Sequence, residues 1–253
     1  MEFIQLNPVE HAAHVGLSRG RSNALNRSML QELQDTLDML QRDDHIQGII
    51  LHGNEGFFSS GLDLIELYDY NEQQIAEFWE AFLHLISSFV AFDKPAVAAI
   101  TGHSPAGGCV LALCCDYRIM AAGEYIIGLN ELAVGIVVPE SIFRLCSFWT
   151  GNRIAYQFLL EGRLLSPQDA LGYGLVDEVT DMKHIRQASE KQLTNYMQLE
   201  QHAWRQTKRY LRDGLLRHFH SWQEEVIAAV LKQWWAPSTR SIVHTVIQNL
   251  KNH

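Results

Sequence analysis

The chain has 253 residues, of which 47 % are hydrophobic, and it carries a formal net charge of −9 at pH 7. This length and hydrophobic content support one large folded domain, with or without an appendage, and exclude a disordered chain. The acidic balance excludes a nucleic-acid-binding protein, although a local site can still bind a small anion.

The four cysteines indicate reduced core residues rather than a metal site or a disulfide framework. Cys109, Cys114, Cys115 and Cys146 lie in apolar stretches and lack the paired spacing of zinc ligands. The first residues lack the pattern of a secretory or organellar targeting segment, and no apolar run has membrane-spanning length. We therefore expect a cytoplasmic enzyme or binding protein that has no membrane segment.

The first fifty residues predict two short strands, an amphipathic helix and a buried strand. Short strand character covers residues 3–6 and 14–17, and an apolar run follows at 46–51. Between them, after Asn26 as the expected N-cap, apolar residues recur at helical spacing: Met29, Leu30, Leu33, Leu37 and Leu40. Strand, helix and strand in succession are typical of a layered α/β domain.

A loop with three glycines, residues 53–64, follows this strand, and loops at that place often carry function. A helix is predicted next over 71–92, with much apolar bulk on it: Phe78, Trp79, Phe82, Leu83, Leu85 and Ile86. Such a helix either walls an apolar pocket or packs in the core, and core packing is the commoner case.

The stretch from His103 to Met120 is where we first look for chemistry. It follows a predicted buried strand at 95–100, and its turn at 105–108, Pro-Ala-Gly-Gly, opens a helix rich in Leu, Ala and Cys. A glycine turn of this kind brings bare backbone N–H groups to a helix N-terminus. The unpaired amides and the helix dipole there favour developing negative charge.

The second half of the chain changes from mixed to helical character. Strands are predicted at 117–121, 125–127 and 175–179, and helices at 141–149, 152–160, 166–172 and beyond 181. We divide the chain into an α/β core, residues 1–190, and a helical C-terminal region, residues 191–253. The helical region carries more apolar surface than a free bundle needs, so it is expected to pack on the core or on a neighbouring subunit. Its tryptophans are Trp204, Trp222, Trp234 and Trp235.

Two glycine turns, 60–62 and 106–108, each follow a strand and could aim one amide at a common point. Two such donors make an oxyanion hole, and each is typically worth about 3 to 4 kcal/mol in the transition state. The alternative is that both are ordinary turns, since glycine after a strand commonly has no other role.

An oxyanion hole needs a base or a nucleophile opposite it. The candidates nearby are His103, Ser104, Cys109, Glu124, Glu131 and Glu140. No nucleophile elbow is present, which favours a carboxylate over the serine and the cysteine. Glu131 stands in an apolar segment, where desolvation would raise its pKa toward that of a useful proton shuttle. The alternative for Glu131 is an ordinary surface glutamate.

At this point the sequence resembles a known family. Phe-Phe-Ser-Ser-Gly-Leu-Asp-Leu at 57–64 and the stretch 103–120 are similar to the acyl-CoA-binding signature of the enoyl-CoA hydratase/isomerase, or crotonase, superfamily. Segments 22–26, 94–102 and 166–179 extend the resemblance over most of the chain. It implies an α/β fold, a spiral of β-β-α units, that assembles as a homotrimer or a hexamer.

The resemblance also implies roles for particular residues. The N–H groups of Leu62 and Gly107 would hold the thioester oxygen of an acyl-CoA substrate. Further substrate contacts are implied at Ala24, Ser60, Gly61, Asp63, Ala106 and Gly108. Arg21 and Lys208 are expected partners for the phosphates or adenine of CoA, with an exposed charge of no role as the alternative at each. No metal or redox cofactor is expected, since CoA is part of the substrate.

Hydratases of the family use two glutamates, and here the first of these positions is Val110 while the second matches Glu131. Adding water calls for two carboxylates, whereas moving a double bond needs only one group that takes and returns a proton. The sequence is therefore similar to the mitochondrial type of delta3,delta2-enoyl-CoA isomerase, although residues 135–143 depart from that pattern. The alternatives are thioester hydrolysis, decarboxylation, or a non-catalytic acyl-CoA-binding subunit.

Overall fold

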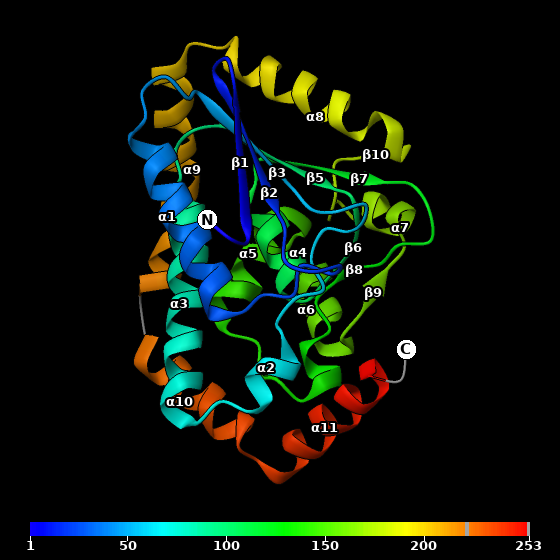
Figure 1. The fold of residues 1–253 in the computed structure, drawn as a ribbon. Coiled ribbons are helices and arrows are strands. Elements are labelled where there is room, and N and C mark those ends of the chain that lie inside the picture. The colour runs from blue at the N-terminus through cyan, green and yellow to red at the C-terminus, as the bar shows by residue number, and fades with distance from the viewer. Residues whose placement is uncertain (221–222, 252–253) are drawn as a thin grey trace.

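A computed structural model describes residues 1–220 and 223–251 (Figure 1). Two sheets form the centre of the molecule. The larger has six strands in the order β1-β2-β3-β5-β7-β10, and the smaller has four in the order β4-β6-β8-β9. The strands of the larger sheet are Ile4–Val9 (β1), Ala12–Leu17 (β2), Gly48–His52 (β3), Ala96–Ile100 (β5), Tyr117–Ala121 (β7) and Glu178–Thr180 (β10).

The chain winds through both sheets in repeated β-β-α units. After the antiparallel pair of β1 and β2, the strands β3, β5 and β7 join the larger sheet in parallel, and each is followed by a short strand of the smaller sheet. The strands of the smaller sheet are Gly56–Phe57 (β4), Gly102–Pro105 (β6), Ile127–Gly128 (β8) and Leu164–Leu165 (β9). The predicted α/β class and its spiral of β-β-α units are thus confirmed.

Each unit ends in helical structure, which covers the sheets and closes the core. The helices up to the last strand are Arg27–Arg42 (α1), Leu64–Tyr68 (α2), Glu72–Ala91 (α3), Gly107–Cys114 (α4), Glu140–Thr150 (α5), Asn152–Glu161 (α6) and Pro167–Gly172 (α7), with a 3-10 turn at Glu131–Val134 (η1). Asn26 caps α1 as predicted, because its side chain accepts a hydrogen bond from the Met29 amide.

The aromatic side chains of helix α3 pack in the core. Phe78, Trp79 and Phe82 are at most 3 % exposed and belong to the main hydrophobic core. Their rings contact one another, and α3 packs against α1, α4, α9 and α10. Core packing is therefore confirmed for this helix. The four cysteines are free and buried, also as predicted.

The C-terminal region consists of four helices: Met182–Met197 (α8), Gln201–His220 (α9), Gln223–Trp234 (α10) and Pro237–Lys251 (α11). Helix α8 lies on β3, β5 and β7, while α9, α10 and α11 pack on the core helices, as expected for this apolar region (Figure 1). The expected division at residue 190 falls inside α8, which is continuous and packed on the sheet. Trp234 is buried in the core, and Trp222 lies outside the described residues.

The smaller sheet is the part of the fold that the sequence pattern did not predict. Its strands have two to four residues each, and a strand of two residues has no period that a sequence can show. The strand predicted at 125–127 is shifted to β8, and the one at 175–179 begins only at Glu178. The smaller sheet nevertheless carries the turns that form the candidate site.

Candidate functional site

The first glycine turn is fixed by a short parallel bridge to the N-terminal loop. The Leu25 amide donates to Gly61 O at 2.8 Å, and the Asp63 amide donates to Leu25 O at 2.9 Å. Leu62, between these two, pairs with Leu25 across the bridge. Gly61 adopts a φ of 83°, in the region that glycine occupies without strain. The Leu62 amide is thereby turned away from the bridge.

The second glycine turn continues from β6, which pairs with β4 on one side and β8 on the other. The Ala106 amide donates to Gly128 O at 2.7 Å, and Ala106 holds the strained dihedrals φ 48° and ψ −121° as the N-cap of α4. No side chain caps this helix end. Its first amides are therefore available to a ligand.

The two turns lie against each other although they are far apart in the sequence. A Cβ atom on Gly61 would lie 3.1 Å from the Gly107 nitrogen, and one on Gly108 would lie 2.4 Å from Ser59 O. Within residues 1–220 and 223–251, neither the Leu62 amide nor the Gly107 amide donates a hydrogen bond to another protein group. Two donors at neighbouring backbone positions make these turns a candidate oxyanion hole.

Glu131 begins η1, three residues after β8. Because β8 pairs with β6, the strand before the second turn, the same part of the sheet positions both the turn and Glu131. The side chain is buried, and Glu131 is only 8 % exposed. Its Oε2 atom has no hydrogen-bond partner among the described residues. Burial raises the pKa of Glu131 from 4.5 to about 7. The predicted effect of the apolar segment is confirmed, and the interpretation as a surface glutamate was wrong.

The other candidates for a base or nucleophile are less suited. Glu124 and Glu140 are exposed, and Glu140 pairs with Arg144 at 2.7 Å. Burial raises the pKa of the Cys109 thiol well above its ordinary value, so the thiolate is disfavoured. His103 packs its ring on Tyr125, and its Nδ1 atom accepts from the Ile126 amide. Of the three glutamates among the candidates, Glu131 is the buried one, and burial raises its pKa to about 7.

Several residues expected to touch substrate form the frame of the first turn. Asp63 caps α2 by accepting from the Glu66 amide at 3.0 Å and pairs with Arg19 at 2.7 Å. Ala24 O accepts from the same guanidinium at 2.8 Å, and the Ser60 amide donates to Ser22 O. These contacts place Ala24, Ser60 and Asp63 beside the Leu62 donor.

Arg19, Asn23 and Ser59 hold this turn, and the sequence analysis did not single them out. The Asn23 side chain donates to Phe58 O at 3.1 Å, and its φ of 52° is unusual for a residue other than glycine. The Ser59 hydroxyl donates to Asn23 O at 2.8 Å. Their position in a polar connection between two glycine-rich segments was the available signal. Arg21 itself is exposed, with its guanidinium 5.9 Å from the Phe57 ring centre.

The expectation of an exposed Lys208 was wrong. Its side chain is buried, and its ammonium donates to Asp116 Oδ2 at 2.7 Å and to Lys94 O at 2.8 Å. Burial lowers the pKa of Lys208 to about 8. Sequence position alone could not show this, because Lys208 meets Asp116 only when α9 packs on the core.

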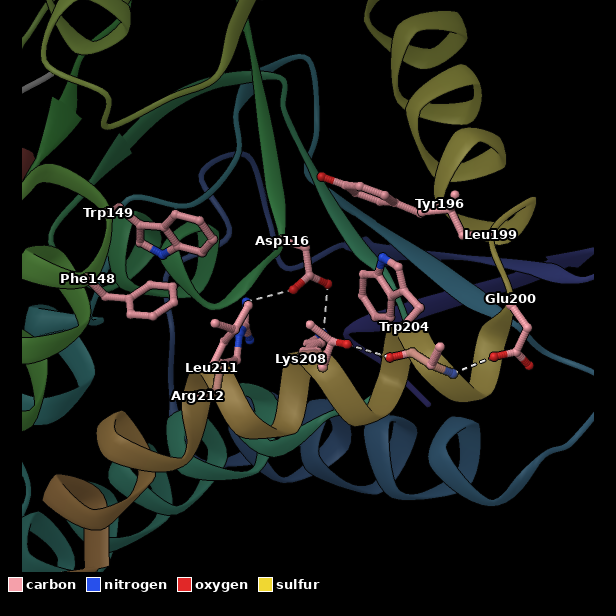
Figure 2. A pocket seen from close by; sticks show the side chains of 12 residues that line it. Asp116, Phe148, Trp149, Tyr196, Leu199, Glu200, Trp204, Lys208, Leu211 and Arg212 are labelled. Atoms are coloured by element: carbon pink, nitrogen blue, oxygen red, sulfur yellow. Dashed lines mark hydrogen bonds and ion pairs between the residues drawn. The ribbon is translucent and has the colours of Figure 1, made fainter.

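Lys208 also lines a cavity of about 470 Å³ that is separate from the two turns. Figure 2 shows Asp116 between Arg212 and Lys208 at this cavity, with Trp149 and Trp204 on opposite sides. Asp116 follows the C-terminal end of α4, whereas Gly107 begins the helix. The helix has eight residues and is therefore about 12 Å long. The role expected for Lys208 toward the phosphates or adenine of CoA stays a prediction.

The arrangement at the N-terminal end of α4 can stabilise an enolate. Two amides would donate hydrogen bonds to an oxygen that carries negative charge, and a carboxyl with a pKa near 7 can take and return a proton. Within the described part of the chain, no group of His, Cys, Asp and Glu side chains is arranged to hold a metal ion. No helix there is long and apolar enough to cross a membrane.

Comparisons with known proteins show which family and which relatives this chain is similar to. The family model described as enoyl-CoA hydratase/isomerase matches residues 10–230. The mouse protein named enoyl-CoA delta isomerase 1, mitochondrial, is 35 % identical over 231 residues, which cover 90 % of this chain and 80 % of that protein. A probable enoyl-CoA hydratase of Mycobacterium avium is 28 % identical over 208 residues, which cover 80 % of each chain.

Two solved structures of isomerases are similar to this chain in fold. The crystal structure of human mitochondrial delta3-delta2-enoyl-CoA isomerase matches with a TM-score of 0.96 and 29 % identity, covering 99 % of this chain and 98 % of that one. An apo structure of an enoyl-CoA isomerase of Mycobacterium tuberculosis matches with a TM-score of 0.82 and 27 % identity, covering 90 % of this chain and 98 % of that one.

Proposed function

The chain belongs to the enoyl-CoA hydratase/isomerase family, and we propose that it moves the double bond of a 3-enoyl-CoA to the conjugated 2-enoyl-CoA. Its fold is the crotonase fold of this family. The substrate is an acyl-CoA thioester, and CoA enters as part of that substrate. Glu131 is the single acid and base, and the amides of Leu62 and Gly107 hold the thioester oxygen.

The reaction divides into two proton transfers. In the first, the Glu131 carboxylate removes a proton from C2, and the electron pair of the broken C–H bond moves toward the thioester carbonyl. The resulting dienolate oxygen carries the negative charge and accepts hydrogen bonds from Leu62 and Gly107. In the second, the Glu131 carboxylic acid returns the proton to C4, and the double bond forms between C2 and C3.

One observation carries the choice of isomerisation: Glu131 is a buried carboxyl whose pKa is raised to about 7. It follows β8, the strand paired with β6, and its charge acts on Cys109 in the first turn of α4. Val110, at the first of the two glutamate positions in hydratases of the family, is an apolar residue that is 1 % exposed. A pKa of about 7 suits a group that must accept a proton in one step and give it up in the next.

The experiment follows the ultraviolet absorbance of the conjugated thioester after a 3-enoyl-CoA is added. We expect the wild type to produce the signal and Glu131→Gln to lower kcat by at least about 10²-fold, since general acid–base catalysis contributes that much. Glu140→Gln is the matched control, because Glu140 is exposed and paired with Arg144. It should retain wild-type activity.

The other outcomes separate the alternatives. A wild type that forms no conjugated product contradicts the isomerase. Release of free CoA thiol would point to thioester hydrolysis, release of CO₂ from a carboxyacyl-CoA to decarboxylation, and binding without reaction to a non-catalytic subunit. An undiminished rate in Glu131→Gln would show that another group is the base.

The proposal includes assembly as a homotrimer or a hexamer, which sedimentation of the purified protein would measure. A cytoplasmic location remains a prediction from the sequence. The mouse and human isomerases compared above carry the word mitochondrial in their names. Fluorescent tagging of the protein in its native cell would decide between the two compartments.

A further inference from the structure

The last helix of the chain contacts both halves of the candidate site, the Glu131 turn and the segment that follows Leu62. Helix α11 packs against η1, which begins with Glu131, and against α2, which follows the Leu62 donor directly. Figure 1 shows α11 running past α2 at the same end of the molecule. Two consecutive residues of α11, Thr239 and Arg240, make the polar contacts, one to each half.

Thr239 is bonded to the turn that carries the base. It is 1 % exposed, and its hydroxyl donates to Gly135 O at 2.9 Å while accepting from the Gln233 side chain at 2.8 Å. Gly135 ends η1, with its amide directed at Glu131 O, and the Ile136 amide donates to Glu131 O at 2.9 Å. One hydroxyl thus anchors the residue that closes the turn of the base.

The contact between Thr239 and this turn is also tightly packed. A Cβ atom on Gly135 would lie 3.0 Å from Thr239 Oγ1 and 3.3 Å from Thr239 Cα. Gly135 has a φ of 76°, a left-handed conformation that favours glycine. The turn therefore presents its bare backbone to α11, and Thr239 fills the space where a side chain would stand.

Arg240 makes the contact to the other half. Its guanidinium lies 3.6 Å from the centre of the Tyr68 ring, and its Nη2 donates to Tyr68 O at 2.9 Å. Tyr68 is the last residue of α2, whose first turn is capped by Asp63 next to Leu62. Stacking and a directed hydrogen bond together fix the end of this short helix.

We propose that Thr239 and Arg240 form a clamp that holds the Glu131 turn in place relative to the oxyanion donor on Leu62. Both are positioning residues, since they act through Gly135 and Tyr68 and not on the substrate. The proposal rests on the proposed function for its kinetic consequence. A carboxyl that shifts by about 1 Å relative to the reacting carbon loses on the order of 10²-fold in rate.

The test compares four single variants in the full-length protein: Thr239→Val, Thr239→Ser, Thr245→Val and Arg240→Met. Thr239→Val keeps the shape of the side chain and removes the hydroxyl, while Thr239→Ser restores it. Thr245→Val is the matched control on the same helix, because Thr245 is exposed and its hydroxyl donates to Ser241 O within α11. Kinetics with a 3-enoyl-CoA are combined with infrared difference spectra that titrate the Glu131 carboxyl in the free protein.

We expect Thr239→Val to lower kcat by on the order of tenfold or more while KM changes by less than about threefold. The same change should lower the pKa of Glu131 toward its ordinary value, because a loosened turn admits water to the carboxyl. Thr239→Ser should recover both quantities, and Thr245→Val should change neither. Arg240→Met should reproduce the loss of kcat through the α2 contact.

A Thr239→Val protein that is folded and keeps both the wild-type kcat and the wild-type pKa of Glu131 would overturn the clamp. So would a variant that is only less stable to heat. If the wild type catalyses no isomerisation, the proposed function fails by itself. The carboxyl titration then still decides the clamp, since it needs no substrate.

Discussion

The two ends of helix α4 carry partial charges of opposite sign, and their surroundings differ. Every residue of this helix, Gly107–Cys114, is buried, and none has a charged side chain. At its N-terminal end the Gly107 amide and the amide of Leu62 in the adjacent turn donate to no other group among the described residues. At its C-terminal end Arg212 donates to Cys114 O at 2.8 Å, and Arg118 donates to Cys115 O at 3.2 Å.

The difference shows how a helix without polar side chains can serve a site. Its negative end is satisfied by cations from other elements, which in turn are held by Asp116 and Asp177. Its positive end has no side-chain cap, and the proposed function assigns that end to a ligand that carries negative charge. We therefore expect changes at the C-terminal end to act on stability, and changes at the N-terminal end to act on catalysis.

The largest effect is expected from Asp116→Asn. Asp116 pairs with Lys208 and Arg212, both buried, so the change leaves two buried cations without their counter-charge. The free energy of unfolding should fall by about 3 to 5 kcal/mol, measured by urea titration. Asp213→Asn is the control on α9, the helix that carries Lys208 and Arg212. It breaks an exposed ion pair and should change stability little.

The same Asp116→Asn protein also tests the proposed division between the two ends. Below its unfolding transition it should keep the wild-type kcat. A stable variant that has lost kcat would show that the C-terminal end of α4 takes part in the chemistry.

The next effect is the pH dependence of stability that Glu131 introduces. Its pKa is raised to about 7, so between about pH 4.5 and 7 the native state binds this proton and the unfolded chain does not. Stability is therefore lost as the pH rises through that window. Relative to Glu131→Gln, the wild type should lose about 3 kcal/mol of unfolding free energy on going from pH 4 to pH 8.

Activity should change in the opposite direction, because the first proton transfer needs the carboxylate. kcat/KM for a 3-enoyl-CoA should rise with pH and level off above about pH 7. Parallel stability curves for the wild type and Glu131→Gln would contradict the raised pKa on which both expectations depend.

A smaller effect is expected from Gly61→Ala at the N-terminal end. The new Cβ would stand 3.1 Å from the Gly107 nitrogen and push the two donor turns apart. Loss of one oxyanion donor should lower kcat by about 10²-fold, or about 2.7 kcal/mol in activation free energy. Gly151→Ala is the matched control, since Gly151 has a similar φ of 80° with nothing within 4 Å of the added Cβ.

Comparing these two alanine variants separates strain from site geometry. Both impose a left-handed conformation on alanine, so a similar loss of stability is expected in each. If Gly151→Ala loses as much kcat as Gly61→Ala, backbone strain rather than the distance between the donors would explain the effect.

Local sequence signals indicated those parts of the candidate site that depend on adjacent residues in the chain. The glycine turn before α4 and the apolar segment around Glu131 were readable because backbone freedom and desolvation are set by adjacent residues. The roles of Arg19 and Asn23 were missed, since their partners lie more than thirty residues away. Lys208 was placed in solvent for the same reason, because its partner Asp116 is 92 positions distant.

The sequence by itself determined the α/β class, the long helices and the family resemblance, because periodicity and motif spacing are properties of consecutive residues. Only the tertiary structure decided that Gly61 lies against Gly107, that Lys208 is buried, and that α11 contacts the site through Thr239. Each of these depends on which distant segments pack together. The same holds for the two ends of α4, whose unlike partners come from loops and helices that no local pattern connects.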